Sequence, residues 1–245
     1  KKYKTKGNKN NHIGVPLTLS SLSNDCKYAV IEIGTNSPGE INNLSAKVNP
    51  DIALIINATA SHLEKLGSIE KVAQEKSRIL EHLKKDGVAV LPKDSKFFSY
   101  WKEKCEGKRI ISFGYHLDSD VCLSNVQNDV TNNQISFDLI YADKSIQCFL
   151  KGIATHNSMN ACAALAVCYA LGMDLEELSI NLNEVVYPSR RMEVKKALKG
   201  SILIDDSYNA NPESMKKSLD VLNDIQGKKR IFVAGEMGEL GKNKD

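Results

Sequence analysis

The sequence lacks several patterns that would each have assigned it to a class of protein. It has no run of about 18 apolar residues, so no membrane-spanning helix is expected. The basic N-terminal stretch, residues 1–11, is not followed by an apolar segment, which argues against a secretory signal. A formal net charge of only +3 is too small to argue for a nucleic-acid-binding protein.

Closely spaced cysteine pairs are also absent. The six cysteines are widely spread and no Cys-x-x-Cys pair occurs, which argues against a zinc site. Reduced thiols and a cytoplasmic location fit this pattern. No internal repeat and no Gly-x-x-x-x-Gly-Lys-Ser/Thr phosphate loop is found.

What the sequence does contain is an alternation of apolar strands and amphipathic helices. The composition, 42% hydrophobic and 26% charged, is ordinary for a globular protein. Residues 119–150 alternate between apolar and polar, which is typical of antiparallel strands with one wet face. We therefore predict an α/β fold with a mostly parallel doubly wound sheet and a small antiparallel extension. Buried strands are predicted at 51–57, 87–91 and 109–114, and helices at 39–48, 68–83, 95–104, 152–172 and 174–185.

The segment from Tyr28 to Ile41 presents one unusual residue. Its apolar run predicts a buried strand from Tyr28 to Ile33, with Glu32 near the carboxyl end, where open α/β sheets place their ligands. A buried carboxylate must be paired, neutralised or bound to a metal. Two interpretations stay open from the strand alone: an edge-exposed or salt-bridged glutamate, and a carboxylate that faces a metal ion.

Other polar residues occur at the ends of predicted elements. His62 lies just beyond the predicted strand at 51–57, where it is either a surface histidine or a site residue. Lys76 lies near the apolar stripe of its helix, where a lysine usually extends its amine into solvent. Asn157 and Asn160 lie in the first turn of the helix at 152–172, where Asn157 fits a helix cap and Asn160 does not.

The C-terminal part reads as the start of a second domain. A boundary is predicted within residues 187–194. A strand from Ile202 to Asp205, a helix after Pro212 and a strand from Arg230 to Ala234 are predicted to form one βαβ unit. One such unit cannot bury a full core, so we expect a truncated domain. The predicted domains are residues 1–190 and 191–245.

Several segments together resemble the Mur ligases of peptidoglycan synthesis, and they occur in family order along the chain. Within this family the resemblance is greatest to members that add D-alanyl-D-alanine to UDP-N-acetylmuramoyl-tripeptide. EIGTNSPGEI and DDSYNANP are highly specific motifs, whereas His-Asn-x-x-Asn alone is weak. The segments are GNKNNHIGVPLTL (7–19), AVIEIGTNSPGEI (29–41), SHLEKLGSIEKVAQEKSRIL (61–80), THNSMNACAA (155–164), RRMEV (190–194), DDSYNANPESM (205–215) and VAGEMGELG (233–241).

The resemblance implies roles for individual residues. Glu32 and His62 match residues that hold magnesium ions at the ATP phosphates. Lys76 matches a lysine that is carbamylated by CO₂ and then helps to hold the second magnesium ion. Such ligands suit magnesium, which prefers hard oxygen atoms and keeps few protein ligands.

The remaining matched residues contact the nucleotide or the substrate. Asn160, with Asn157 beside it, matches the asparagine at adenine. Arg191 and Asp206 match residues that reach the nucleotide from the third-domain side; Arg190 is the alternative to Arg191, because Ser-Arg-Arg replaces the family's usual Gly-Arg. Asn11 and His12 match the loop that contacts the UDP-muramoyl substrate.

The reaction implied by the resemblance is ATP-dependent amide formation through an acyl phosphate, in a cytoplasmic enzyme that is monomeric when intact. The family's phosphate loop is expected shortly before residue 1, so the chain is interpreted as the middle of a larger ligase, inactive by itself. The alternatives are another Mur ligase, a folylpolyglutamate synthase-like ligase, against which DDSYNANP argues, and a non-catalytic fragment that keeps the fold for binding. The third residue of the tripeptide stays open.

Overall fold

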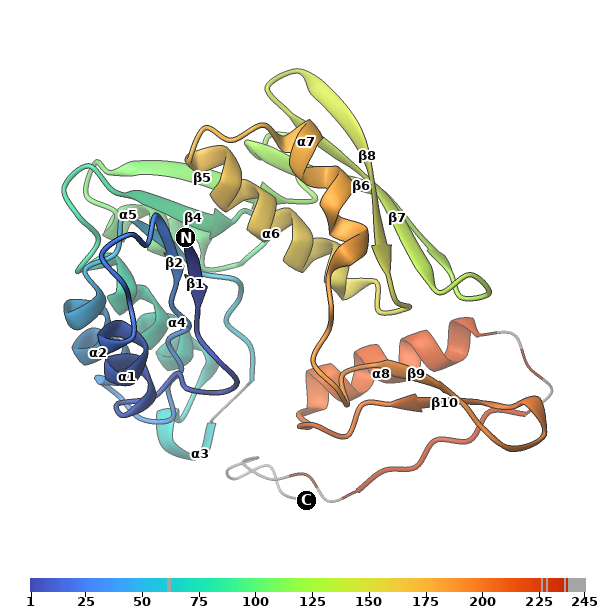
Figure 1. Cartoon of the computed structure of the whole chain (residues 1–245). Helices are drawn as coiled ribbons and strands as arrows, with labels where there is room; N and C mark the ends of the chain where they lie inside the picture. Colours follow the sequence, from blue (N-terminus) through green and yellow to red (C-terminus); the bar gives the residue numbers. More distant parts are fainter. Residues whose placement is uncertain (61–62, 226, 228, 236, 238–245) are drawn as a thin grey trace. The chain divides into compact units, whose positions relative to one another are not determined.

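The computed structural model describes residues 1–60, 63–225, 227, 229–235 and 237 (Figure 1). Contacts between residues divide the described chain into two units. Unit 1 comprises residues 1–89 and 96–110, and unit 2 comprises residues 90–95 and 111–237. No helix among the described residues is long and apolar enough to cross a membrane.

The strands of the main sheet follow one another in chain order, β3-β4-β5-β6-β7-β8. Strand β5 pairs in parallel with β6, and the hairpins β6–β7 and β7–β8 are antiparallel, with an irregularity in β6 between Ser124 and Gln127. The predicted fold class, a mostly parallel α/β sheet with a small antiparallel extension, is confirmed. The strands are β3 (Ile52–Leu54), β4 (Val88–Pro92), β5 (Arg109–Gly114), β6 (Val121–Asp129), β7 (Gln134–Tyr141) and β8 (Lys144–Lys151).

Hydrophobic patterning explains these strands. All five residues of β4 are buried, as expected for an apolar strand covered on both faces. Strand β7 instead buries every second residue, from Ile135 to Tyr141, because successive side chains point to opposite faces of a sheet. In unit 2, the Ala-rich helix α6 (His156–Ala170) packs against β6 and β7, and α7 (Leu175–Ile180) packs against β8 (Figure 1).

In unit 1, helix α4 (Ile69–Ser77) buries Val72, Ala73, Glu75 and Ser77. Ser68 caps its N-terminus by accepting a hydrogen bond from Lys71 N, as predicted, and the helix continues as a 3₁₀ turn, Arg78–Leu80. The indole Nε1 of Trp101 donates to Ala73 O at 3.0 Å, and Trp101 is completely buried. The other helices of the unit are α1 (Gly14–Ser20), α2 (Glu40–Val48), α3 (Leu63–Leu66) and α5 (Phe98–Lys104).

The predicted buried strand from Tyr28 to Ile33 is wrong in length and in environment. Strand β2 covers only Tyr28–Val30, and all three of its residues are exposed. It pairs in parallel with β1 (Lys2–Lys4) in a two-stranded sheet. No further described strand pairs with β2, the side chains of β2 are open to solvent, and Glu32 is exposed rather than buried.

The C-terminal part of unit 2 also departs from the expected βαβ unit. Strand β10 (Ile202–Asp205) occurs as predicted, but it pairs antiparallel with β9 (Glu193–Lys196), which the sequence analysis did not predict. Helix α8 (Pro212–Asp224) begins at a capping box formed by Asn211 and Ser214. The predicted strand from Arg230 to Ala234 is wrong: these residues form no strand.

A small apolar cluster packs the start of this region against the end of β8. It contains Ile153, Ala154, Met192 and Val221, each at most 7% exposed, with Val130, Ile204 and Ile225 packed around them. The predicted domain boundary at residue 190 lies just before Met192. Met192 is one of the residues that pack strands β9 and β10 and helix α8 onto the residues that follow β8.

Candidate functional site

In unit 1, a carboxylate and a loop amide meet beyond the end of β2. Glu32 Oε1 accepts a hydrogen bond from Asn10 Nδ2 at 2.8 Å, and its backbone N donates to Thr5 Oγ1 at 2.9 Å. Gly34 N donates to Asn10 O at 2.9 Å. A Cβ atom on Gly34 would lie only 2.9 Å from the Asn10 amide group, so a larger residue at position 34 would displace the Asn10 side chain. Asn10 therefore fixes the direction of the Glu32 carboxylate.

The turn that follows Glu32 is organised by a second carboxylate. Glu40 Oε2 accepts from Asn36 N at 2.6 Å and from Ser37 N at 3.0 Å. These hydrogen bonds, with that of Asn36 the largest contribution, hold the pKa of Glu40 below its usual value. Glu40 is thus an anion that closes the turn of residues 34–39 onto the start of α2.

A third carboxylate, Glu75 of α4, reaches the same turn and is only 4% exposed. Its two oxygens accept from Gly39 N at 2.8 Å and from Ile41 N at 2.9 Å. Gly39 is the N-cap residue of α2, has φ +86°, and offers no side chain to the free amides of the helix start. Glu75 therefore caps α2 from a different helix.

The next residue of α4, Lys76, points to the carboxyl end of β3. Its Nζ donates to Asn57 O at 2.8 Å. Burial lowers the pKa of Lys76, because the charged amine loses hydration. The expected surface lysine is therefore a partly desolvated amine that gives up its proton more readily than a solvated one.

The other predicted site residues of unit 1 are Asn11, His12 and His62. His62 lies outside the described residues, and His12 is exposed. Asn11 Oδ1 accepts from Ile13 N at 3.1 Å and from Gly14 N at 2.9 Å, which occupies its oxygen at the start of α1. Across the described part of the chain, no three His, Cys, Asp or Glu side chains gather as a metal cluster.

In unit 2, the two predicted adenine-site asparagines lie side by side. Asn160 Nδ2 donates to Asn157 Oδ1 at 3.3 Å, and Asn160 is exposed. Thr155, rather than Asn157, is the N-cap residue of α6, so the capping interpretation of Asn157 is wrong. Burial lowers the pKa of the neighbouring His156, with a further lowering by Lys217 and an opposing effect of Asp206.

Arg191 and Asp206 meet through the backbone of one turn. Asp206 Oδ1 accepts from Met192 N at 3.0 Å, and Asp206 Oδ2 accepts from Ser218 Oγ at 2.6 Å. The Arg191 guanidinium lies 4.2 Å from the centroid of the Tyr208 ring. Asp206 therefore holds the turn that presents Arg191, and both of its carboxylate oxygens have protein partners.

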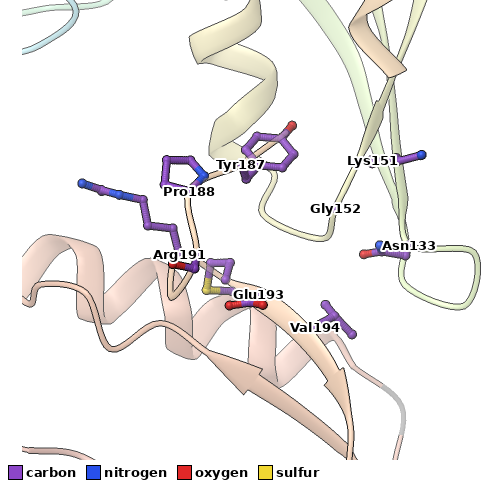
Figure 2. Close-up of a pocket in the computed structure, with 10 residues that line it drawn as sticks. Asn133, Lys151, Gly152, Tyr187, Pro188, Arg191, Glu193 and Val194 are labelled. Carbon is purple, nitrogen blue, oxygen red and sulfur yellow. The ribbon is translucent and has the colours of Figure 1, made fainter. Parts of the chain in front are cut away.

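A pocket of about 280 Å³ lies on one side of this turn (Figure 2). The Arg191 side chain extends away from Asn133 and Lys151 on the opposite wall, so its guanidinium is not turned into the pocket. The hydroxyl of Tyr187 is buried without a hydrogen-bond partner among the described residues. The lining residues are Asn133, Lys151, Gly152, Tyr187, Pro188, Ser189, Arg191, Met192, Glu193 and Val194.

Comparison with protein-family models gives two matches in succession. The Mur ligase middle domain matches residues 1–168, and the Mur ligase, glutamate ligase domain matches residues 190–245. The chain belongs to the Mur ligase family. The resemblance inferred from EIGTNSPGEI and DDSYNANP is thereby confirmed.

Individual relatives within the family are consistent with this assignment. The chain is 38% identical to UDP-N-acetylmuramoyl-tripeptide--D-alanyl-D-alanine ligase of Buchnera aphidicola, over 96% of the chain and 51% of that protein. MurF from Acinetobacter baumannii superimposes with a TM-score of 0.93 at 33% identity, over 99% of this chain and 52% of that one. MurF from Thermotoga maritima in complex with ADP gives a TM-score of 0.84 at 28% identity, over 99% and 55%. The chain spans about half the length of the curated relatives that it matches.

Sequence reasoning missed Asn10, Glu75 and Tyr208. Glu75 follows Val72 by three residues and so lies on the apolar stripe of α4, where a carboxylate signals a specific partner. Asn10 and Tyr208 lie within the family segments, but no local pattern predicts their partners, which lie 22 and 17 residues away. The roles of the predicted site residues in binding and catalysis stay predictions.

Proposed function

We propose that this chain belongs to the ligase that adds D-Ala-D-Ala to UDP-N-acetylmuramoyl-tripeptide. It is the part that binds ATP, together with the start of the domain that contacts the nucleotide from the other side. The observation that supports this most is the match to a ligase of that specificity, at 38% identity over 96% of the chain. In this assignment residues 1–190 are the central ATP-binding domain and residues 191–245 begin the C-terminal domain. The enzyme works in the cytoplasm as a monomer.

The proposed reaction has two steps. A carboxylate oxygen of the tripeptide attacks the γ-phosphorus of ATP, the bond from that phosphorus to the β–γ bridging oxygen breaks, and ADP leaves. The amine of D-Ala-D-Ala then attacks the acyl carbon of the acyl phosphate, loses a proton, and inorganic phosphate leaves as the amide forms. Such phosphoryl transfer depends on positioning and on neutralising charge.

The described site residues of unit 1 fit a magnesium ion, the group that would neutralise the charge of the ATP phosphates. Glu32 presents a carboxylate fixed by Asn10, and Lys76 presents a desolvated amine whose lowered pKa favours the neutral form that CO₂ carbamylates. Glu32, His62 and carbamylated Lys76 would hold Mg²⁺. Bound Mg²⁺ would supply charge neutralisation at the ATP phosphates. Asn11 and His12 would contact the UDP-muramoyl substrate.

The residues of unit 2 fit a nucleotide. The exposed Asn160 amide, with Asn157 beside it, would contact adenine, and Arg191 would reach the phosphates. Both carboxylate oxygens of Asp206 already accept hydrogen bonds, from Met192 N and Ser218 Oγ. Asp206 would therefore affect nucleotide binding mainly by fixing the turn that carries Arg191.

A substrate panel tests this function. The natural-length protein is incubated with ATP, Mg²⁺ and one of three substrate pairs: UDP-N-acetylmuramoyl-tripeptide with D-Ala-D-Ala, UDP-N-acetylmuramoyl-dipeptide with diaminopimelate, or folate with glutamate. Phosphate release is measured, and we expect it only with the first pair. Release with UDP-N-acetylmuramoyl-dipeptide and diaminopimelate would instead assign a sister ligase, release with folate and glutamate a folylpolyglutamate synthase, and no release with any pair a non-catalytic protein.

A further inference from the structure

The turn of residues 190–192 has an unusual backbone. Arg190 has φ +60° and Met192 has φ +52°, so two non-glycine residues in the left-handed region flank Arg191. Such conformations are unfavourable for residues with a Cβ atom, and they persist only where surrounding contacts enforce them. The side chain between these two residues is Arg191.

Three hydrogen bonds enforce this turn, and a fourth holds one of its partners, Asp206. Arg190 N donates to Glu193 Oε2 at 3.0 Å, and Arg190 O accepts from Tyr208 N at 3.1 Å. Met192 N donates to Asp206 Oδ1 at 3.0 Å, and Asp206 is itself held by Ser218 Oγ. The Met192 side chain is 7% exposed in the apolar cluster with Ile153, Ala154 and Val221. The backbone on both sides of Arg191 is therefore fixed while its side chain is exposed.

Tyr208 contacts the turn twice, through its backbone N and through its ring. Tyr208 is 43% exposed as a residue, and the guanidinium of Arg191 lies over its ring, 4.2 Å from the centroid. Among the residues that the structure describes, no carboxylate forms an ion pair with Arg191. An aromatic face orients a guanidinium without neutralising it, whereas a carboxylate would cancel its charge. The charge of Arg191 stays available to an anionic ligand.

We propose that Tyr208 is a positioning residue for Arg191: its ring holds the guanidinium in the direction from which it binds a phosphate group of the nucleotide. This inference rests on the proposed function, in which Arg191 reaches the nucleotide. It assigns Tyr208 no contact with the reacting atoms. It predicts that the ring matters, that the hydroxyl does not, and that the effect of Tyr208 vanishes without Arg191.

The test is a double-mutant cycle on the KM for ATP in the natural-length protein. Tyr208→Leu removes the ring and is expected to raise this KM roughly two- to fivefold, the effect of an exposed cation–π contact, with little change in kcat. Tyr208→Phe is expected to retain the wild-type KM. Arg191→Ala is expected to raise the KM further, and adding Tyr208→Leu to Arg191→Ala is expected to have no additional effect. Tyr208→Gln is a second variant without the ring.

Tyr100→Leu is the matched control, because the Tyr100 ring also contacts a cation, Lys104 Nζ at 5.7 Å, but lies on α5 of unit 1. It is expected to leave the KM for ATP unchanged. The inference is overturned if Tyr208→Leu raises the KM equally with and without Arg191, if Tyr208→Phe costs as much as Tyr208→Leu, or if neither ring-less variant changes the KM.

A second readout is independent of activity. In protein with ¹⁵N-labelled arginine, the Arg191 Nε–H proton resonance is expected upfield in the wild type and in Tyr208→Phe, because of the ring current, and at an ordinary position in Tyr208→Leu. An unchanged resonance in Tyr208→Leu contradicts the stacking. A wild type without ligase activity contradicts the proposed function, whereas an active wild type whose KM is insensitive to Tyr208→Leu contradicts only this inference.

Discussion

Removing the carboxylate of Glu75 is predicted to destabilise unit 1 strongly. Glu75 is 4% exposed and accepts hydrogen bonds from Gly39 N and Ile41 N at 2.8 and 2.9 Å. A hydrogen bond to a charged group contributes about 1.5–3 kcal/mol. Two such bonds, less the cost of keeping a carboxylate desolvated, give an expected loss for Glu75→Ala of about 3 kcal/mol. Glu75→Gln is also expected to be destabilising, because its amide oxygen can accept from only one of the two N–H groups and its NH₂, a donor, opposes the other.

The single tryptophan makes this prediction measurable in unit 1. Trp101 is fully buried and its Nε1 donates to Ala73 O of α4, the helix that contains Glu75. Urea unfolding is therefore followed by tryptophan fluorescence in the wild type and in each variant. Glu70→Ala is the control on the same helix, because the exposed Glu70 carboxylate pairs with Lys96 at the surface and its loss is expected to change stability far less than the loss of Glu75. A Glu75→Ala loss equal to that of Glu70→Ala would refute the capping role.

Three further predictions concern single residues. Lys76→Ala is expected to lower the ligase rate by orders of magnitude while preserving the fold, and formate is expected to restore part of the rate because the missing group is a carbamate. Lys76→Arg is expected to be inactive with or without formate. Near wild-type activity of Lys76→Ala without formate would contradict the proposed role of Lys76. Asn211→Ala removes the side chain that accepts from Ser214 N at 2.9 Å and is expected to destabilise α8 by about 1 kcal/mol, measured by urea unfolding. The pKa of Asp205 is lowered to about 2, chiefly by Lys195 and further by Ser207, so its contribution to stability is present above pH 3.8 and is lost as the pH falls towards 2. In Lys195→Met a carboxyl ¹³C titration is expected to give a raised pKa that stays below 3.8, because Ser207 N and Oγ still donate to Asp205 Oδ1.

Elements with a strong local pattern were predictable from the sequence. The alternation in β7 and the continuous apolar run in β4 each identify a strand, because burial on one or two faces is recorded in the residues themselves. The helix cap at Ser68 was predictable for the same reason: its hydrogen-bond partner lies three residues along the chain.

The environment of β2 could not be predicted in this way. An apolar run shows that a strand can be buried, but burial depends on which strands and helices cover it. Strand β2 pairs with β1 in a two-stranded sheet, and its side chains stay exposed. The segment from Arg230 to Ala234 also contains a run of apolar residues and forms no strand, because a strand needs a hydrogen-bonding partner as well as apolar side chains.

The sequence predicted which residues form the candidate site but not which residues orient them. Family motifs indicated Glu32, Lys76 and Arg191 from the sequence. The groups that orient them, Asn10, Asn57 and Tyr208, are 22, 19 and 17 residues away along the chain, and their contacts exist only in the folded protein. Asp206 illustrates the difference, because the motif suggests a nucleotide contact and the structure shows an acceptor for Met192 N and Ser218 Oγ.

Isotope transfer tests the central claim, ATP-dependent ligation through an acyl phosphate, most directly. UDP-N-acetylmuramoyl-tripeptide labelled with ¹⁸O in its terminal carboxylate is incubated with the natural-length protein, ATP, Mg²⁺ and D-Ala-D-Ala, and the released phosphate is analysed by mass spectrometry. The account predicts that one carboxylate ¹⁸O appears in the inorganic phosphate for each amide formed. Unlabelled phosphate, or ¹⁸O recovered in AMP, would contradict it.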